Sequence, residues 1–328
     1  MPNSIKSGLV LAERMIPVPS TVSPEAQAFL SRGLSVMPPE IPHSDKQAYK
    51  IYIAQIEEFL IKAAKSRAES YPADIADHHL SKSTLYEITP RALRTDFENN
   101  AILHIHGGAF IVGGGISCAY TAQPVASLTG IRTFSIDYRM PPDHPFPRGL
   151  EDCVEAYKFL LQRYTPTNIG FEGSSAGANL VAATILKARD EGLPLPGACS
   201  LHTAGVDLTA AGDSFTTNEH IDVVLRKNQR ETMLLYADGH SLTHPYVSPL
   251  FGDFFKGFPP SLLLTGTRDL LLSPTVMMHR ALRRAGIDAD LHVFEAMPHG
   301  GLGGSSPEDY ELRGEIARFF LNRLALFR

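Results

Sequence analysis

The 328-residue sequence predicts an α/β protein with a mostly parallel central sheet, helices on both of its faces and a helical cap. Short apolar runs recur from about residue 100 to 295 and alternate with segments of helical character, and such alternation is typical of a parallel sheet covered on both faces. One connection, about residues 207 to 258, is too long for an open loop, so we expect a helical insertion over the sheet's C-terminal edge.

The N-terminal part is predicted to be helical. Ser23 is placed to cap a helix that starts at Pro24, and Ser44 with Gln47 fits a capping box. The residues after this box recur at steps of three and four, as in an amphipathic helix that ends before Pro72; they are Tyr49, Tyr52, Ile53, Ile56, Phe59, Leu60 and Ala63.

Strands are predicted from about residue 75 onward. Residues 78–88 suggest an antiparallel pair at a sheet edge. Further strands are expected at 101–106, 131–137, 168–172, 198–204, 261–266 and 289–295. Two of the intervening helices have clear signals: an apolar face at Val154, Tyr157, Leu160 and Tyr164, and a start at Ser273-Pro274 with an end near Gly286.

These signals divide the chain into four parts. We expect an N-terminal helical cap segment at 1–74, the first part of an α/β core at 75–206, a cap insertion at 207–258 and the second part of the core at 259–328.

Composition excludes several classes of function. The net charge is -5 and no Lys/Arg run occurs, which argues against nucleic acid and membrane surfaces as partners. No apolar stretch reaches about 18 residues, and residues 9–12 are too short for the core of a signal peptide. Three scattered cysteines, Cys118, Cys153 and Cys199, predict neither disulfides nor a zinc cluster, and a cytoplasmic location fits them best.

The stretch from Gly173 to Gly177 fits the pattern G-x-S-x-G, with Ser175 at its centre. A predicted strand precedes it and a predicted helix follows, as at the sharp turn that exposes a catalytic serine. The neighbouring glycines leave room for that turn, and the helix N-terminus points its positive dipole end at the reacting oxygen. The alternative is an ordinary glycine-rich turn with a solvent-facing serine.

A second glycine-rich segment, from His106 to Phe110, directly follows the strand at 101–106. Such backbone can offer N–H groups to an oxyanion. A plain flexible loop is the alternative. A dinucleotide loop is disfavoured because no G-x-G-x-x-G opens a helix here, and His104 with His106 lacks the further ligands of a metal site.

An acid and a base complete the pattern. Asp269 follows the strand at 261–266, and His299 lies in the loop beyond the strand at 289–295. Serine needs an imidazole to take its proton and a carboxylate to orient that imidazole, and the chain order Ser, Asp, His is that of α/β-hydrolases. Asp207 competes for the acid's role, but it comes one strand too early.

The whole set resembles the hormone-sensitive-lipase-like (family IV) esterases of the α/β-hydrolase superfamily. The resemblance covers about residues 100 to 301, and residues 21–30 resemble the family's N-terminal cap. It is carried by HGGAF (106–110), DYRMPPDHPFP (137–147), GSSAGAN (173–179), SPLFGDF (248–254), TGTRDLLLS (265–273) and MPHGG (297–301).

This resemblance implies Ser175 as nucleophile, Asp269 as acid and His299 as base. It also implies oxyanion donors at Gly108, Ala109 and Ala176, with His106 and Gly107 in the oxyanion loop and His106 bracing it. Ala109 replaces the family's usual third glycine, and Ser174 stands where Asp or Thr is usual.

We therefore predict a serine carboxylesterase for short- to medium-chain acyl esters that forms an acyl-enzyme and uses no metal or other cofactor. Lactones, amides and carbamates are alternative substrates, and a non-catalytic ligand-binding receptor on the same fold is the alternative of another class. The family allows a homodimer through the strand at 289–295 and the helix after it. Apolar residues of the insertion could line the pocket, although most aromatics at such spacing simply pack in the core of a cap; these residues are Phe215, Val223, Leu225, Phe251, Phe254 and Phe255.

Overall fold

The structure is a computed structural model that describes residues 13, 15–36, 39–227 and 229–325. The apolar patch at residues 9–12 lies outside the described residues. Eight strands form one sheet in the order β1-β2-β4-β3-β5-β6-β7-β8. Their bounds are β1 (Ala73–His79), β2 (Thr84–Pro90), β3 (Ala101–Ile105), β4 (Arg132–Asp137), β5 (Ile169–Ser174), β6 (Ala198–His202), β7 (Ser261–Gly266) and β8 (Ala289–Phe294).

The pairing of the strands confirms the predicted mostly parallel sheet. β1 and β2 form an antiparallel hairpin, and β2 is also antiparallel to β4. All other pairs are parallel. Because parallel strands end at the same edge, the loops after β3, β5, β7 and β8 lie together.

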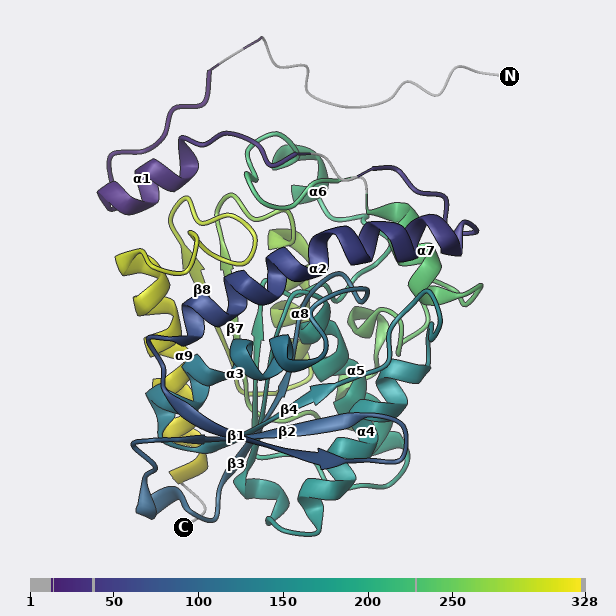
Figure 1. Ribbon diagram of the computed structural model, residues 1–328, viewed down its shortest axis with the longest axis vertical. Helices are drawn as coiled ribbons and strands as arrows, with labels where there is room; N and C mark the ends of the chain where they lie inside the picture. The colour runs from purple at the N-terminus through teal and green to yellow at the C-terminus, as the bar shows by residue number, and fades with distance from the viewer. Residues whose placement is uncertain (1–12, 14, 37–38, 228, 326–328) are drawn as a thin grey trace.

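Helices cover both faces of this sheet (Figure 1). The bounds are α1 (Pro24–Leu30), α2 (Lys46–Ala68), α3 (Ile116–Thr129), α4 (Arg148–Leu161), α5 (Ala176–Asp190), α6 (Ser214–Thr217), α7 (Arg230–Ala237), α8 (Leu272–Arg284) and α9 (Pro307–Ala325). One face packs against α4, α5 and α8 through Leu103, Phe134, Phe171, Leu201 and Leu263. The other packs against α3 and α9 through Ile102, Ala198, Leu262 and Leu264.

The N-terminal helices agree with the sequence, with one shift. Ser23 caps α1 and accepts a hydrogen bond from Ala26 N at 3.1 Å. The predicted capping box at Ser44 is wrong by one residue, since Asp45 is the N-cap of α2 and accepts from Ala48 N at 2.9 Å. Asp45 therefore accepts from the N3 amide, as an N-cap side chain does. α2 then runs diagonally across the molecule beside α3 (Figure 1).

The insertion at 207–258 is less helical than predicted. It holds only the short helices α6 and α7 and two 3₁₀ turns, at Pro249–Phe251 and Phe254–Lys256. Side chains replace the missing helical hydrogen bonds: Ser248 Oγ accepts from Leu208 N, and Asn218 Nδ2 donates to Asp269 O. The segment is therefore held to the core by polar contacts from its own side chains.

Two further observations bear on the sequence predictions. Cys118, Cys153 and Cys199 are free, buried thiols. Of the helices that the structure describes, none combines the length and the apolar character needed to cross a bilayer.

Candidate active site

Ser175 sits on a strained turn between β5 and α5. Its φ is 58° and its ψ is -121°, in a region that L-residues rarely adopt. A Cβ on Gly177 would lie 2.0 Å from the carbonyl oxygen of Ile105, and one on Gly173 would lie 2.9 Å from the same oxygen. Only glycine fits at either position, so the two glycines allow the turn that exposes the serine.

The structure brings the three predicted side chains together. Ser175 Oγ lies 2.9 Å from His299 Nε2, and His299 Nδ1 lies 3.1 Å from Asp269 Oδ1. A carboxylate can only accept, so Nδ1 carries the proton and Nε2 is left to accept from the serine hydroxyl. Asp269 is fully buried and His299 is 8% exposed, which strengthens both contacts.

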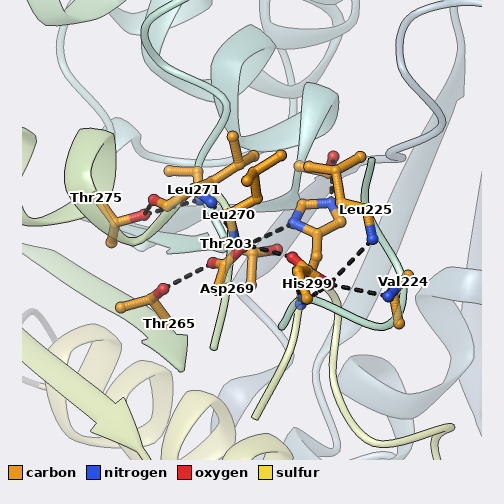
Figure 2. Close-up of polar contacts among 12 residues, drawn as sticks. Thr203, Val224, Leu225, Thr265, Asp269, Leu270, Leu271, Thr275 and His299 are labelled. Atoms are coloured by element: carbon orange, nitrogen blue, oxygen red, sulfur yellow. Dashed lines mark hydrogen bonds and ion pairs between the residues drawn. The ribbon is translucent and has the colours of Figure 1, made fainter. Parts of the chain in front are cut away.

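Asp269 is itself fixed by two donors. Thr265 Oγ1 donates to Oδ2 at 2.7 Å, and Leu271 N donates to Oδ1 at 2.9 Å. Figure 2 shows these contacts together with the one to His299. The carboxylate is thus held in one orientation toward the imidazole.

Electrostatics favours protonation of His299. Burial alone lowers the pKa of this imidazole, but the hydrogen bond to Asp269 and the charges of Asp269 and Asp222 outweigh burial, and the net pKa is raised above its usual value. An imidazolium at His299 is therefore stabilised by these contacts.

Asp222 is a residue of this site that the sequence did not indicate. It is fully buried, and its carboxylate accepts from Val224 N at 2.9 Å and from Leu270 N at 2.8 Å. His299 N donates to it at 3.3 Å. One aspartate of the insertion therefore holds both the acid's loop and the base's loop. In the sequence, Asp222 is a single acidic residue next to apolar ones, a pattern that does not indicate contacts to these two loops.

Asp207 lies elsewhere. Its Oδ1 accepts from Thr209 N at 2.9 Å and from Thr209 Oγ1 at 2.6 Å, so it caps a turn at the start of the insertion. The carboxylate that contacts His299 belongs to Asp269.

The oxyanion loop lies directly against the nucleophile. A Cβ on Gly107 would lie 2.8 Å from Ser174 O and 3.4 Å from Ser175 Cβ. Gly108 has a φ of 116° and Ala109 a φ of 51°. Ala109 thus adopts the left-handed conformation that glycine prefers, and its backbone N–H is retained. Ala176, the first residue of α5, follows the serine.

His106 braces this loop from behind. Its Nδ1 donates to Gly107 O at 2.7 Å, and its ring stacks on Tyr138 with 4.2 Å between the ring centroids. Tyr138 Oη in turn donates to His106 O at 3.0 Å. Burial lowers the pKa of His106 to about 4, so the ring is neutral at pH 7 and its place is structural.

A cavity of about 770 Å³ opens at these residues, within the range of small-molecule sites. Ser175, His299 and the oxyanion loop line it at one side, and Tyr52, Ile56 and Leu60 of α2 at another. Most of the apolar residues of the insertion that could have lined this cavity do not. Of the six candidates only Leu225 lines the cavity; Phe251 and Phe255 are exposed, and Phe215, Val223 and Phe254 pack elsewhere.

Within the described ranges, no three His, Cys, Asp or Glu side chains are grouped as a metal site would require.

Comparisons with known proteins agree with this architecture. A profile of the α/β-hydrolase fold family matches residues 102–302. The chain is 31% identical over 204 residues to an acetyl-hydrolase of Streptomyces hygroscopicus, which covers 62% of this chain and 68% of that protein. It is also 29% identical over 199 residues to an esterase of Acinetobacter venetianus. This match covers 60% of this chain and 65% of the esterase, just under two thirds of the esterase's length.

The crystal structure of esterase E25 superposes with a TM-score of 0.87 and 34% identity, covering 96% of this chain and 99% of that one. An esterase from the bacterial hormone-sensitive lipase family superposes with a TM-score of 0.75 and 28% identity, covering 92% of this chain and 99% of that one. The described geometry and these relatives lead to one assignment. The chain belongs to the α/β-hydrolase fold family, within its hormone-sensitive-lipase-like group of carboxylic ester hydrolases.

Proposed function

We propose that this protein hydrolyses carboxylic esters of short to medium acyl chains through an acyl-enzyme on Ser175. The observation that carries the proposal is the continuous contact from Ser175 Oγ through His299 to Asp269, with distances of 2.9 and 3.1 Å. The cavity at this contact is large enough for a small ester and is closed on one side by apolar residues of α2.

The first half of the reaction forms the acyl-enzyme. Ser175 Oγ attacks the ester carbonyl while His299 Nε2 takes the hydroxyl proton. The negative charge on the former carbonyl oxygen is stabilised by the backbone N–H groups of Gly108, Ala109 and Ala176. His299 then gives its proton to the leaving alcohol as the carbon–oxygen bond breaks.

The second half releases the acid. His299 takes a proton from a water molecule, whose oxygen attacks the acyl carbonyl. The tetrahedral intermediate collapses, the proton returns to Ser175 Oγ, and the carboxylic acid leaves. Asp269 stays ionised throughout and stabilises the imidazolium in both halves.

The test is hydrolysis of p-nitrophenyl esters of increasing acyl length by wild type and by Ser175→Ala. A lactone and an anilide assayed alongside separate the alternative substrates. Ser127→Ala is the matched control, since Ser127 lies in α3 away from the cavity lining. We expect Ser175→Ala to lose several orders of magnitude in kcat. If wild type is inactive, or if wild type and Ser175→Ala hydrolyse the esters at equal rates, the non-catalytic receptor becomes the favoured alternative.

The homodimer stays a prediction. β8 is the last strand in the sheet order, and Val293 on it is 45% exposed, so this edge is free to pair with another strand. Light scattering of wild type and Val293→Lys would measure the molecular mass in solution. A dimer through this edge predicts a twofold mass for wild type and a lower mass for the variant.

A further inference from the structure

A row of polar residues crosses the sheet beneath the active site. Ser135, His104, Glu172 and Ser200 are successive partners on β4, β3, β5 and β6. Residues paired in register on neighbouring strands share one face of a sheet, here the face that α3 and α9 cover. All four are buried. Buried polar groups on an otherwise apolar face are costly unless they find partners.

The middle of this row faces the active-site cavity. His104 and Glu172 line it, together with Ser174 and His202, which are partners two residues nearer the strand ends. We call His104, Glu172, Ser174 and His202 the polar floor. It belongs to the same cavity as Ser175 and His299.

Two groups of the polar floor have no hydrogen-bond partner in the described part of the chain. The carboxyl group of Glu172 makes no hydrogen bond with the described residues, and one of its oxygens lies 3.5 Å from His104 Nε2, beyond a normal hydrogen bond. His202 Nε2 has no partner among the described residues. Both residues are more than nine-tenths buried. Glu172 lines the cavity with a carboxyl group that has no hydrogen bond to the described residues, whereas His202 Nε2 is itself enclosed by protein atoms.

The polar floor carries no charge at neutral pH. Burial raises the pKa of Glu172 to about 8, and burial lowers the pKa of His104 to about 3 and that of His202 to about 4. A neutral carboxyl and neutral imidazoles offer both donors and acceptors. They match a neutral group that can also do both. Arg67, Asp309 and Arg313 are charged side chains that line the same cavity but lie outside the polar floor.

We propose that the polar floor is a subsite for a hydroxyl group on the substrate, remote from the ester bond. The proposal rests on the proposed ester hydrolysis at Ser175. Glu172 lies on β5 three positions before Ser175, a separation of about 10 Å for extended backbone, so the hydroxyl sits near the far end of a chain of medium length. The natural substrate is then an ester of a hydroxylated acid or of a diol.

The experiment compares esters that differ only in a terminal hydroxyl and methyl group. One pair is p-nitrophenyl 6-hydroxyhexanoate and p-nitrophenyl heptanoate, for the acyl side. The other is 6-hydroxyhexyl acetate and heptyl acetate, for the alcohol side. The measured quantity is the ratio of kcat/KM within each pair, which does not depend on the fraction of folded enzyme.

Wild type is expected to prefer the hydroxylated member of one pair by about tenfold or more, mainly through a lower KM. Glu172→Leu should bring this ratio near or below one, whereas Glu172→Gln, which keeps a donor and an acceptor, should retain most of it. Ser127→Ala serves as the control with the wild-type ratio. His202→Leu provides a second variant should Glu172→Leu fail to fold.

Three outcomes would overturn the proposal. One is a wild-type ratio near one in both pairs, which needs no variant at all. Another is a wild-type preference that Glu172→Leu and His202→Leu leave unchanged. The third is stronger preference for the 6-aminohexanoate ester, which would assign the subsite to a cation. Failure of the proposed function looks different, because wild type would then hydrolyse neither member of either pair.

Discussion

Replacing Asp269 by Asn removes one charge and leaves its hydrogen bonds in place. Asp269 Oδ1 accepts from both Leu271 N and His299 Nδ1, and Oδ2 accepts from Thr265 Oγ1. An asparagine oxygen at the first position keeps both bonds, and its amide nitrogen can donate to the threonine hydroxyl. The fold and the imidazole tautomer are therefore expected to survive in Asp269→Asn.

The loss is then the charge that stabilises the imidazolium. Two charges about 4 Å apart interact by about 4 kcal/mol at an effective dielectric constant near 20. Since about 1.4 kcal/mol corresponds to a factor of ten, kcat should fall roughly a thousandfold, with KM little changed. The acid limb of the pH profile should also move to lower pH, because burial then lowers the pKa of His299 with less opposition.

The assay is kcat and KM for p-nitrophenyl butyrate across the acid and neutral range, with thermal melting of each protein. Asp207→Asn is the matched control, because Asp207 hydrogen-bonds to Thr209 and not to His299. Wild-type activity within a factor of ten in folded Asp269→Asn would refute the reasoning. A larger loss in Asp222→Asn would then move the acid's role to Asp222.

The other predictions concern backbone and pH. Gly177→Ala should prevent folding or sharply lower the melting temperature, because its Cβ would lie 2.0 Å from Ile105 O. The control is Gly314→Ala in α9, whose Cβ would have no neighbouring atom within 4 Å. It should raise the free energy of unfolding by up to about 1 kcal/mol. Ala109→Gly should relieve the left-handed backbone and raise the free energy of unfolding by up to about 1 kcal/mol, visible in urea midpoints, with esterase activity retained; a lower midpoint would contradict this. The free energy of unfolding should decrease as pH falls from 6.5 toward 4.5, because three histidines stay neutral in the fold but gain protons on unfolding. The three histidines are His104, His106 and His202, and each contributes roughly 1.4 kcal/mol per pH unit. Glu172 is protonated in the fold but ionised when unfolded, so it offsets one of them. Urea midpoints that do not fall with pH would count against these pKa values.

The core of the fold could be predicted because its signals are local. Each apolar run became a strand whose ends lie within two residues of the predicted ones, and glycines with the serine at 173–177 marked one specific turn. The chain order of Ser175, Asp269 and His299 placed them on loops at one sheet edge. Parallel topology then brings such loops together without further information.

What could not be predicted depends on contacts between distant segments. The role of Asp222 arises from amides 48 and 77 residues away in sequence, and no pattern around it records them. The N-terminal segment was expected to cap the site, and α2 does line the cavity; which of its residues form the wall depends on how α2 packs on α3. The polar floor depends on strand register, which places His104 beside Glu172.

The contacts of Asp222 have a consequence for engineering this enzyme. Because the insertion supplies the carboxylate that ties the acid's loop to the base's loop, it is not an interchangeable module. Grafting the insertion of a relative to change selectivity would also release both loops unless an equivalent aspartate came with it. α2 makes no such tie to these loops and yet forms much of the cavity wall, so it is the better element to diversify.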